Sequence, residues 1–503
     1  MTKQLIGTAL LCMFLAGVAY AEDEAPVMYA NTPDRNMVSD EENLPAKWDA
    51  KTGMNIKWTA DLGSQTYAGP VVYDGRVFVG TNNQRVYNPA IKGDRGNVMA
   101  FDAETGEFIW QSAHAKLPSG RVNDWPLQGV CSTPAVEGDR IYYLSNRGEI
   151  IAADTDGFRD GANDGPFVDE EHTSKLDEDV IWRFDLIEEL DMFPHNLAAG
   201  SPLLVGDWLF FITGQGVDEG HINVPSPEGP SFVAFDKNSG ELLWENALPG
   251  TNVLHGTWSN PSYGKIQGRE QVIFPGGDGW LYSFNPKDGE LLWKFDLNPK
   301  DSKWELGGRG TRNNVISTAV IHDDKVFIGV GQDPEHGEGP GNLWAIDATG
   351  SGDVTSTAVV WRRHGDDFHR TMSTAAIQDG LMYIADLSGF VYCLDVKTGK
   401  EIWTYDAFAA IWGSTFLADG KVYIGDEDGD IAVLKAGRKM ELLHETNMGT
   451  AVYTTPVAKD GVIYVASRTK LFAIEGGIPA KTPPAAPAAL AVDAPPAKKS
   501  EAK

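Results

Sequence analysis

Residues 102–110 read Asp-Ala-Glu-Thr-Gly-Glu-Phe-Ile-Trp, and residues 395–403 repeat the pattern as Asp-Val-Lys-Thr-Gly-Lys-Glu-Ile-Trp. A turn rich in Asp, Thr and Gly that leads into β-branched and aromatic residues predicts a tight turn followed by a strand. Further copies keep the order of Asp or Asn, Gly and Trp, at residues 236–244 and 285–293 and, in stretched form, at 154–182 and 347–361. Such self-similarity is typical of a repeat protein in which each copy forms one structural unit.

A second motif alternates with the first. It begins with two small residues and a Pro, Ala or Thr, and a two-residue turn, most often Asp-Gly, follows a few residues later. The copies are marked by Pro70, Pro134, Pro202, Pro261, Ala319, Ala375, Thr415 and Pro456. Asp-Gly between alternating apolar runs is a strong β-hairpin signal, because a type I′ turn needs positive φ at both central residues. The sequence therefore predicts eight hairpins.

The two motifs do not pair off at the C-terminal end. The eighth copy of the second motif ends near Glu475, and no Gly and Trp pair follows it. The missing segment lies at the other end, where Asp49 and Gly53 precede Trp58. We therefore predict an all-β fold, an eight-bladed β-propeller over residues 47–477, whose last blade is closed by an N-terminal strand. Closure removes exposed sheet edges, whereas an open solenoid, the alternative, leaves the displaced segment unexplained.

The ends of the chain predict its location. Residues 1–21 combine Lys3, an apolar run and a small-residue cleavage site, which is typical of a secretory signal peptide, and the run is too short to span a membrane. Residues 22–46 are expected to form an acidic N-terminal arm. Residues 478–503, rich in Pro and Ala, are expected to be a disordered tail. The sequence thus predicts an exported protein, periplasmic or extracellular, without a transmembrane segment.

Composition disfavours several functions. The 503 residues include 71 acidic and 42 basic side chains, and the formal net charge is −29. Such a surface repels phosphate groups, so we expect neither nucleic-acid binding nor docking on anionic membranes. Two cysteines, Cys131 and Cys393, follow the signal peptide. The sequence leaves open whether they form a disulfide, and two separate buried thiols are the simpler interpretation.

The Asp-x-x-Thr-Gly-x-x-x-Trp copies resemble the tryptophan-docking repeats of quinoprotein (PQQ-type) propellers, and the resemblance covers all eight predicted blades. It implies that most of the Trp residues pack between neighbouring blades. It also implies PQQ and Ca²⁺ as possible cofactors, since enzymes of this family hold the quinone against a Trp and a disulfide of adjacent cysteines, with Ca²⁺ and an Asp base nearby. Cys131 and Cys393 are not adjacent. No calcium-ligand set or catalytic Asp matches residue by residue.

Polar and aromatic side chains precede the second motifs, where the loops of a propeller converge on one mouth of the central channel. The candidate ligand-binding residues there are Trp125, His195, His255, Trp258, Arg312, Asn314, His369, Trp412 and Tyr453. They would supply stacking platforms and positive groups; alternatively, they only hydrogen-bond to neighbouring blades. Long insertions at 81–97, 214–231 and 331–342 should emerge on the same face. The last contains Asp333, Glu335 and Glu338, candidate oxygen ligands for a cation.

These observations favour a non-catalytic binding or assembly scaffold, monomeric, with a protein, small-molecule or carbohydrate ligand at the channel mouth. The same repeats build the propeller lipoprotein of the outer-membrane barrel assembly machinery, a likeness at the level of fold. One alternative is a PQQ-dependent dehydrogenase of alcohols or sugars. Another is a carbohydrate- or peptide-binding module. The hydrolase motifs G-x-S-x-G and H-E-x-x-H are absent from the sequence.

Overall fold

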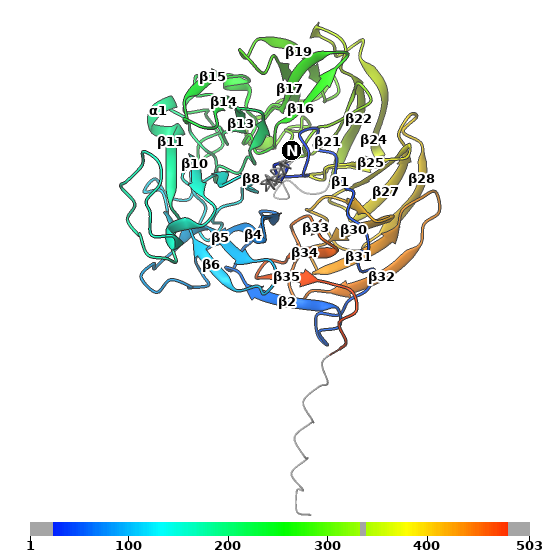
Figure 1. Ribbon diagram of the computed structural model, residues 1–503. Helices are drawn as coiled ribbons and strands as arrows, with labels where there is room; N and C mark the ends of the chain where they lie inside the picture. The colour runs from blue at the N-terminus through cyan, green and yellow to red at the C-terminus, as the bar shows by residue number, and fades with distance from the viewer. Residues whose placement is uncertain (1–23, 332–338, 481–503) are drawn as a thin grey trace, which may run out of the picture.

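The chain folds into eight sheets arranged as blades around a central axis, as Figure 1 shows. The structure is a computed structural model that describes residues 24–331 and 339–480. Each sheet is built on four antiparallel strands, from the innermost to the outermost. The architecture is therefore the eight-bladed β-propeller that the repeats predict. The predicted signal peptide lies outside the described residues, as does nearly all of the predicted tail.

The strands of the first four blades follow one another along the chain. Blade 1 contains β3 (Val71–Tyr73), β4 (Arg76–Asn82), β5 (Arg95–Asp102) and β6 (Phe108–Gln111). Blade 2 contains β8 (Ala135–Glu137), β9 (Arg140–Leu144), β10 (Glu149–Asp154) and β11 (Val180–Asp185). Blade 3 contains β12 (Leu203–Val205), β13 (Trp208–Ile212), β14 (Phe232–Asp236) and β15 (Leu242–Asn246). Blade 4 contains β16 (Ser262–Ile266), β17 (Arg269–Pro275), β18 (Trp280–Phe284) and β19 (Leu291–Asp296).

The remaining blades repeat this order, and only the last draws on both ends of the chain. Blade 5 contains β20 (Val320–His322), β21 (Lys325–Val330), β22 (Pro340–Asp347) and β24 (Val359–His369). Blade 6 contains β25 (Ala376–Gln378), β26 (Leu381–Ala385), β27 (Phe390–Asp395) and β28 (Glu401–Asp406). Blade 7 contains β29 (Phe416–Ala418), β30 (Lys421–Gly425), β31 (Asp430–Lys435) and β32 (Leu442–Asn447). Blade 8 contains β33 (Val457–Lys459), β34 (Val462–Ala466), β35 (Lys470–Ile474) and β2 (Ile56–Asp61).

Short strands and helical segments lie outside the four main strands of each blade. β1 (Val38–Ser39) pairs with β29, β7 (His114–Ala115) pairs with β5, and β23 (Gly352–Asp353) pairs with β19. The helical segments are α1 (Leu186–Leu190) and the 3₁₀ turns η1 (Gly157–Arg159), η2 (Gly250–Asn252) and η3 (Leu306–Gly308). Within the described part of the chain, no helix is long and apolar enough to cross a membrane.

Ring closure follows the prediction. β2 pairs antiparallel with β35, and Trp58 lies opposite Ala473 in this ladder. The hairpin turns also have the expected chemistry, since Asp74 and Gly75 have φ of 45° and 71°. In two hairpin turns, Gly138-Asp139 and Gly206-Asp207, the Gly comes first. Only the Gly of each turn has positive φ, which is the type II′ pattern.

Six Trp residues of the repeat join neighbouring blades through the same contact. The indole Nε1 donates to a backbone carbonyl at the turn of the next blade, and in every case but Trp403 the ring packs on the Gly of that turn. The pairs are Trp58 to Ala103, Trp110 to Thr155, Trp182 to Lys237, Trp244 to Pro286, Trp361 to Val396 and Trp403 to Gly437, at 2.8–3.0 Å. These bonds satisfy the indole N–H in the core, where an unpaired donor would be costly.

At two junctions between blades, a different contact takes the place of this hydrogen bond from Trp to the backbone. Trp293 of blade 4 donates to the Gln271 side chain at 2.7 Å, and Gln271 in turn donates to the Ala348 carbonyl of blade 5 at 3.2 Å. In blade 7 the Trp position is occupied by His444, opposite Val433 in the ladder. Its Nε2 lies 2.8 Å from the carbonyl oxygen of Trp48, so a His replaces the Trp at the junction with blade 8.

The N-terminal segment from residue 24 to 46, dark blue in Figure 1, crosses the ring. It contacts the hairpin turns between first and second strands at Asp74, Asp419 and Gly461. Arg35 is fully buried and donates to the carbonyls of Tyr29, Pro202 and Pro261 at 2.6–2.8 Å. β1 then adds to the inner strand of blade 7. The segment thus binds several blades and covers the channel from this side.

Candidate binding site at the channel mouth

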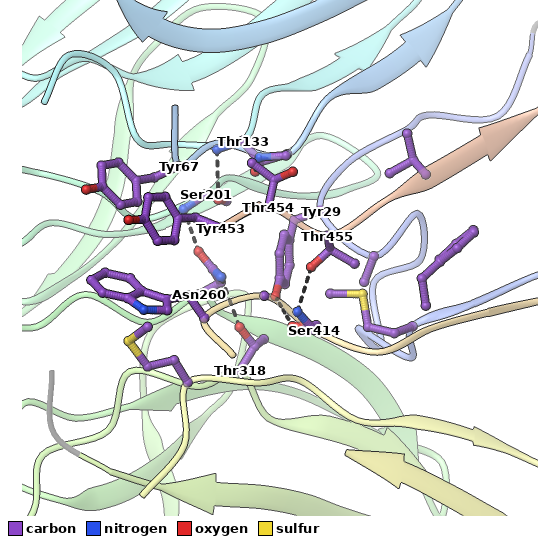
Figure 2. Close-up of a pocket in the computed structure, with 18 of the residues that line it drawn as sticks. Tyr29, Tyr67, Thr133, Ser201, Asn260, Thr318, Ser414, Tyr453, Thr454 and Thr455 are labelled. Atoms are coloured by element: carbon purple, nitrogen blue, oxygen red, sulfur yellow. Dashed lines mark hydrogen bonds between the residues drawn. The ribbon is translucent and has the colours of Figure 1, made fainter. Parts of the chain in front are cut away.

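A cavity of about 290 Å³ lies in the central channel between the N-terminal segment and the mouth loops. Met28, Tyr29 and Met37 of the N-terminal segment line one end, and Tyr67, Trp412 and Tyr453 line another part of it. Figure 2 shows Tyr29, Tyr67 and Tyr453 among the side chains that surround this cavity, although they are far apart in the sequence. The cavity is therefore a cup with a floor supplied by the chain itself rather than a channel that runs through the ring.

A girdle of hydroxyl and amide side chains surrounds this cup and ties the blades together. It is formed by the small polar residues of the second motif, namely Thr133, Ser201, Asn260, Thr318, Ser414 and Thr455. Several neighbours are hydrogen-bonded: Thr133 N donates to Ser201 Oγ at 3.0 Å, and Ser201 N donates to Asn260 Oδ1 at 2.7 Å (Figure 2). Since a hydroxyl both donates and accepts, the girdle keeps hydrogen-bonding capacity for a ligand.

Three aromatic side chains form a cluster at one side of the cup. Tyr67 stacks on Tyr453 with ring centroids 5.1 Å apart, and Trp412 lies 4.8 Å from Tyr453. Burial raises the pKa of Tyr67, so its hydroxyl stays protonated at neutral pH. Trp412 and Tyr453 were predicted from their position before the second motif. Tyr67 was missed, although it stands in the same place before Pro70.

A second cluster lies at the mouth between blades 2, 3 and 4. The rings of His195 and His255 are 4.4 Å apart, and Trp258 packs edge-on against His255 at 5.0 Å. His221, in the loop between β13 and β14, completes the cluster, and one imidazole nitrogen from each of the three His residues lies within 4.8 Å of the others. Trp125 borders the cluster through a small cavity that it shares with His195 and His221. No pattern in the sequence singled out His221.

The other predicted mouth residues bond to protein groups. Arg312 forms an ion pair with Asp296 at 2.6 Å and donates to the carbonyl of Asp278 at 2.8 Å. Asn314 donates to a backbone carbonyl of the neighbouring loop at 3.3 Å. His369 is partly exposed and lies 3.0 Å from the buried Asp386 carboxylate. The predicted residues therefore divide into two aromatic clusters and a set of inter-loop bonds.

The candidate cation ligands Asp333, Glu335 and Glu338 lie outside the described residues. Cys131 and Cys393 are both free thiols. Cys131 lines the channel cup, whereas Cys393 is buried in β27. Burial raises the pKa of each thiol to about 12, so neither is a reactive thiolate at neutral pH.

The cup does not fit PQQ with Ca²⁺. Among the described residues, those that line it include no Lys, Arg, Asp or Glu. The carboxylates of PQQ need positive partners, and Ca²⁺ needs carboxylate oxygens, because burying unpaired charges is costly. The free, separated cysteines also cannot form the disulfide of adjacent cysteines that the resemblance implies. The lining suits an uncharged group that stacks on rings and hydrogen-bonds to hydroxyls.

The chain matches a family model of PQQ-type repeats described as "Outer membrane protein assembly factor BamB" over residues 88–160, 170–352 and 341–477. BamB of Yersinia pestis is 21% identical over 333 residues, which cover 66% of this chain and 70% of that protein. Polyvinylalcohol dehydrogenase of Sphingopyxis sp. is 23% identical over 388 residues, which cover 66% of this chain and 54% of the enzyme. The relatives thus include both assembly factors and dehydrogenases.

Solved structures show the same fold. BamB from Moraxella catarrhalis superposes with a TM-score of 0.51 at 14% identity, covering 84% of this chain and 97% of that one. A europium-containing methanol dehydrogenase superposes with a TM-score of 0.60 at 13% identity, covering 88% of this chain and 90% of the enzyme. At such identities the likeness concerns the fold alone.

Proposed function

Because the chain belongs to the PQQ-type propeller family described as outer membrane protein assembly factor BamB, we propose that it is a non-catalytic binding scaffold whose channel cup holds an uncharged segment of a protein partner. The observation that carries the proposal is the cup itself. It has a floor made by the N-terminal segment, an aromatic cluster at one side, and no charged residue among the described residues that line it. Such a site binds by stacking and hydrogen bonds.

Neutral carbohydrate is the second candidate ligand. Tyr67, Trp412 and Tyr453 offer ring faces, and the girdle residues offer hydroxyl groups at the same cup. That combination suits a sugar ring, whose apolar face stacks and whose hydroxyls donate and accept. A PQQ-dependent dehydrogenase is the third possibility, supported by dehydrogenase relatives and opposed by the uncharged lining.

We propose a periplasmic or extracellular location for this scaffold. The support is the predicted signal peptide at residues 1–21, together with relatives named as outer membrane protein assembly factors. The strongly negative formal charge of −29 fits a partner that is a protein or a neutral ligand rather than a nucleic acid.

The test titrates the purified full chain with uncharged peptides rich in aromatic residues, with neutral oligosaccharides, and with PQQ plus Ca²⁺. Trp fluorescence reports binding, and dye-coupled oxidation of alcohols and sugars reports turnover. We expect saturable binding of the peptides, no turnover, and roughly tenfold or greater weakening in Tyr453→Ala, because truncated aromatic anchors dominate such sites. Phe408→Ala, at a side chain 89% exposed and outside the cup, is the matched control.

Any of the following results would contradict the proposal. Saturable PQQ binding with dye reduction would establish a dehydrogenase. Binding of oligosaccharides alone would establish the carbohydrate module. Absence of binding by both peptides and sugars, or equal effects of Tyr453→Ala and Phe408→Ala, would show that the cup is not a ligand site.

A further inference from the structure

Three imidazole side chains meet at the channel mouth from three separate loops. His195 follows α1, His221 lies between β13 and β14, and His255 follows η2. Their ring centroids are 4.4–4.8 Å apart, and one nitrogen of each lies within 4.8 Å of the others. His195 and His255 are almost fully buried, at 2% and 1% exposed. Three imidazoles in mutual contact form a set of nitrogen donors that transition metals prefer.

The backbone holds these loops together tightly. His195 N donates to the Gly214 carbonyl at 3.1 Å, and Val217 N donates to the His255 carbonyl at 3.0 Å. Gly216 lies between them, and a Cβ there would come within 2.4 Å of the His195 Cβ and 2.7 Å of the His255 carbonyl oxygen. A side chain at this position would push the two His residues apart. The close approach of the loops, and so of the imidazoles, therefore depends on a glycine.

Hydrogen bonding sets the orientation of His195. Its Nδ1 lies 2.7 Å from the carbonyl oxygen of Val217, so Nδ1 carries the proton and donates. The lone pair is then on Nε2, which faces His221 Nε2 at 3.1 Å. An N–H bond to a backbone carbonyl is the usual outer-sphere support of a metal-bound His. Two nitrogens bound to one tetrahedral ion at about 2.05 Å are roughly 3.3 Å apart, close to this separation.

An opening adjoins the cluster. A cavity of about 170 Å³ is bordered by His195 and His221 together with Trp125 and Asn196. Arg121 and Glu219, which also border it, form an ion pair at 2.7 Å. Three protein ligands next to an accessible space are the arrangement of a metal site with a fourth position open to water or a ligand.

We propose that His195, His221 and His255 bind one divalent transition-metal ion of the Zn²⁺ type through their imidazole nitrogens, with a fourth coordination position facing the adjoining cavity. The three His residues do not line the channel cup, but they adjoin it through Trp258, which lines the cup and packs against His255. Its nitrogen donors distinguish it from a Ca²⁺ site, because hard cations take oxygen ligands.

The test uses the full chain without a polyhistidine tag, titrated with Co²⁺ and followed by its visible d–d absorption, with Zn²⁺ as competitor. We expect one Co²⁺ per chain with the intense bands of four-coordinate cobalt, displaced by Zn²⁺ and not by Ca²⁺. His221→Ala should weaken binding by roughly a hundredfold or more, since even outer-sphere partners of metal ligands are worth about 10–100-fold. His221 is partly exposed on a loop, so this variant should fold.

His322→Ala, at a partly exposed His in a hairpin of blade 5, is the matched control and should leave the bands unchanged. Gly216→Ala supplies a second test without removing a ligand: it should weaken Co²⁺ binding while circular dichroism stays unchanged. Absence of the bands, displacement by Ca²⁺, or equal binding by the His221→Ala variant would overturn the proposal.

Discussion

The indole Nε1 of Trp58 donates a hydrogen bond to the carbonyl oxygen of Ala103 over 2.9 Å, and this bond joins blade 8 to blade 1. Trp58 belongs to the N-terminal strand β2, so the contact locks the closing strand to the neighbouring blade as well as to β35. It is the same contact that other Trp residues make at other junctions. Ring closure therefore uses the repeat itself and needs no special element.

Trp58→Ala should destabilise the ring at its closure. The side chain is 8% exposed, and Trp-to-Ala changes in cores cost about 3–5 kcal/mol. Urea unfolding followed by circular dichroism measures the change. Trp304→Ala, at a side chain 44% exposed, should cost less than about 1 kcal/mol. Equal losses in both variants would show that the docking contact does not hold the ring.

Gly106→Ala should be more harmful than Gly75→Ala, although both glycines have similar positive φ, 74° and 71°. A Cβ at Gly106 would lie 2.6 Å from the Trp58 ring, whereas a Cβ at Gly75 meets nothing within 4 Å. Both variants carry backbone strain of about 1–2 kcal/mol, so their difference isolates the clash. In a Trp58→Ala background the difference should shrink, which a double-mutant cycle would measure.

A chain of buried hydrogen bonds lies on the rim of blades 1 and 2. His114 Nε2 is 2.7 Å from Tyr143 Oη, and Tyr143 donates to Glu178 Oε1 at 2.6 Å. Burial raises the pKa of Glu178 from 4.5 to about 8 and lowers the pKa of His114 from 6.5 to about 3. Both groups are therefore neutral in the folded protein near neutral pH.

These shifts predict a pH dependence of stability. Glu178 contributes fully below pH 4.5, and its contribution is lost as the pH rises to about 8. His114 contributes fully above pH 6.5 and loses its contribution as the pH falls to about 3. Between pH 4.5 and 6.5 the two groups change the free energy of unfolding in opposite directions. From pH 6.5 to 8 only Glu178, of these two groups, still changes it. There the free energy of unfolding should fall by about 1.4 kcal/mol per pH unit.

Urea unfolding at pH 6.5, 7.25 and 8 checks the slope. Glu178→Gln should flatten it, because the neutral amide does not titrate. Glu189→Gln, at an exposed residue of nearby α1, should keep it. A wild-type stability that stays level or rises over this range would contradict the assigned pKa of Glu178.

Arg35→Met should loosen the N-terminal segment that forms the floor of the cup. The substitution leaves three carbonyls, of Tyr29, Pro202 and Pro261, without their donor, and each buried unsatisfied group costs about 1–3 kcal/mol. Burial lowers the pKa of Arg35 only to about 9, so the wild-type guanidinium is charged at neutral pH. Chymotrypsin should then cut the N-terminal segment near Tyr29 faster. Arg85→Met, at a side chain 52% exposed, should leave cleavage unchanged.

The number of blades could be predicted from the sequence because each blade contains turns with a characteristic local sequence. Asp-Gly hairpins mark the inner strands, and the Gly before each Trp marks the docking turn, as Gly106 does for Trp58. Even the irregular seventh junction was visible as a missing Trp near His444. Trp412 and Tyr453 could be placed near the mouth because loops at one end of a propeller converge.

Sequence alone therefore established the ring, its closure by the N-terminal strand and the structural role of the Trp residues in the repeat, since period and turn type depend on neighbours along the chain. The tertiary structure alone showed that the N-terminal segment covers the channel and that His221 joins His195 and His255. It also showed that Arg312 is paired with Asp296. These contacts join loops whose side-chain directions follow no period, so they depend on how the closed ring packs its loops against each other.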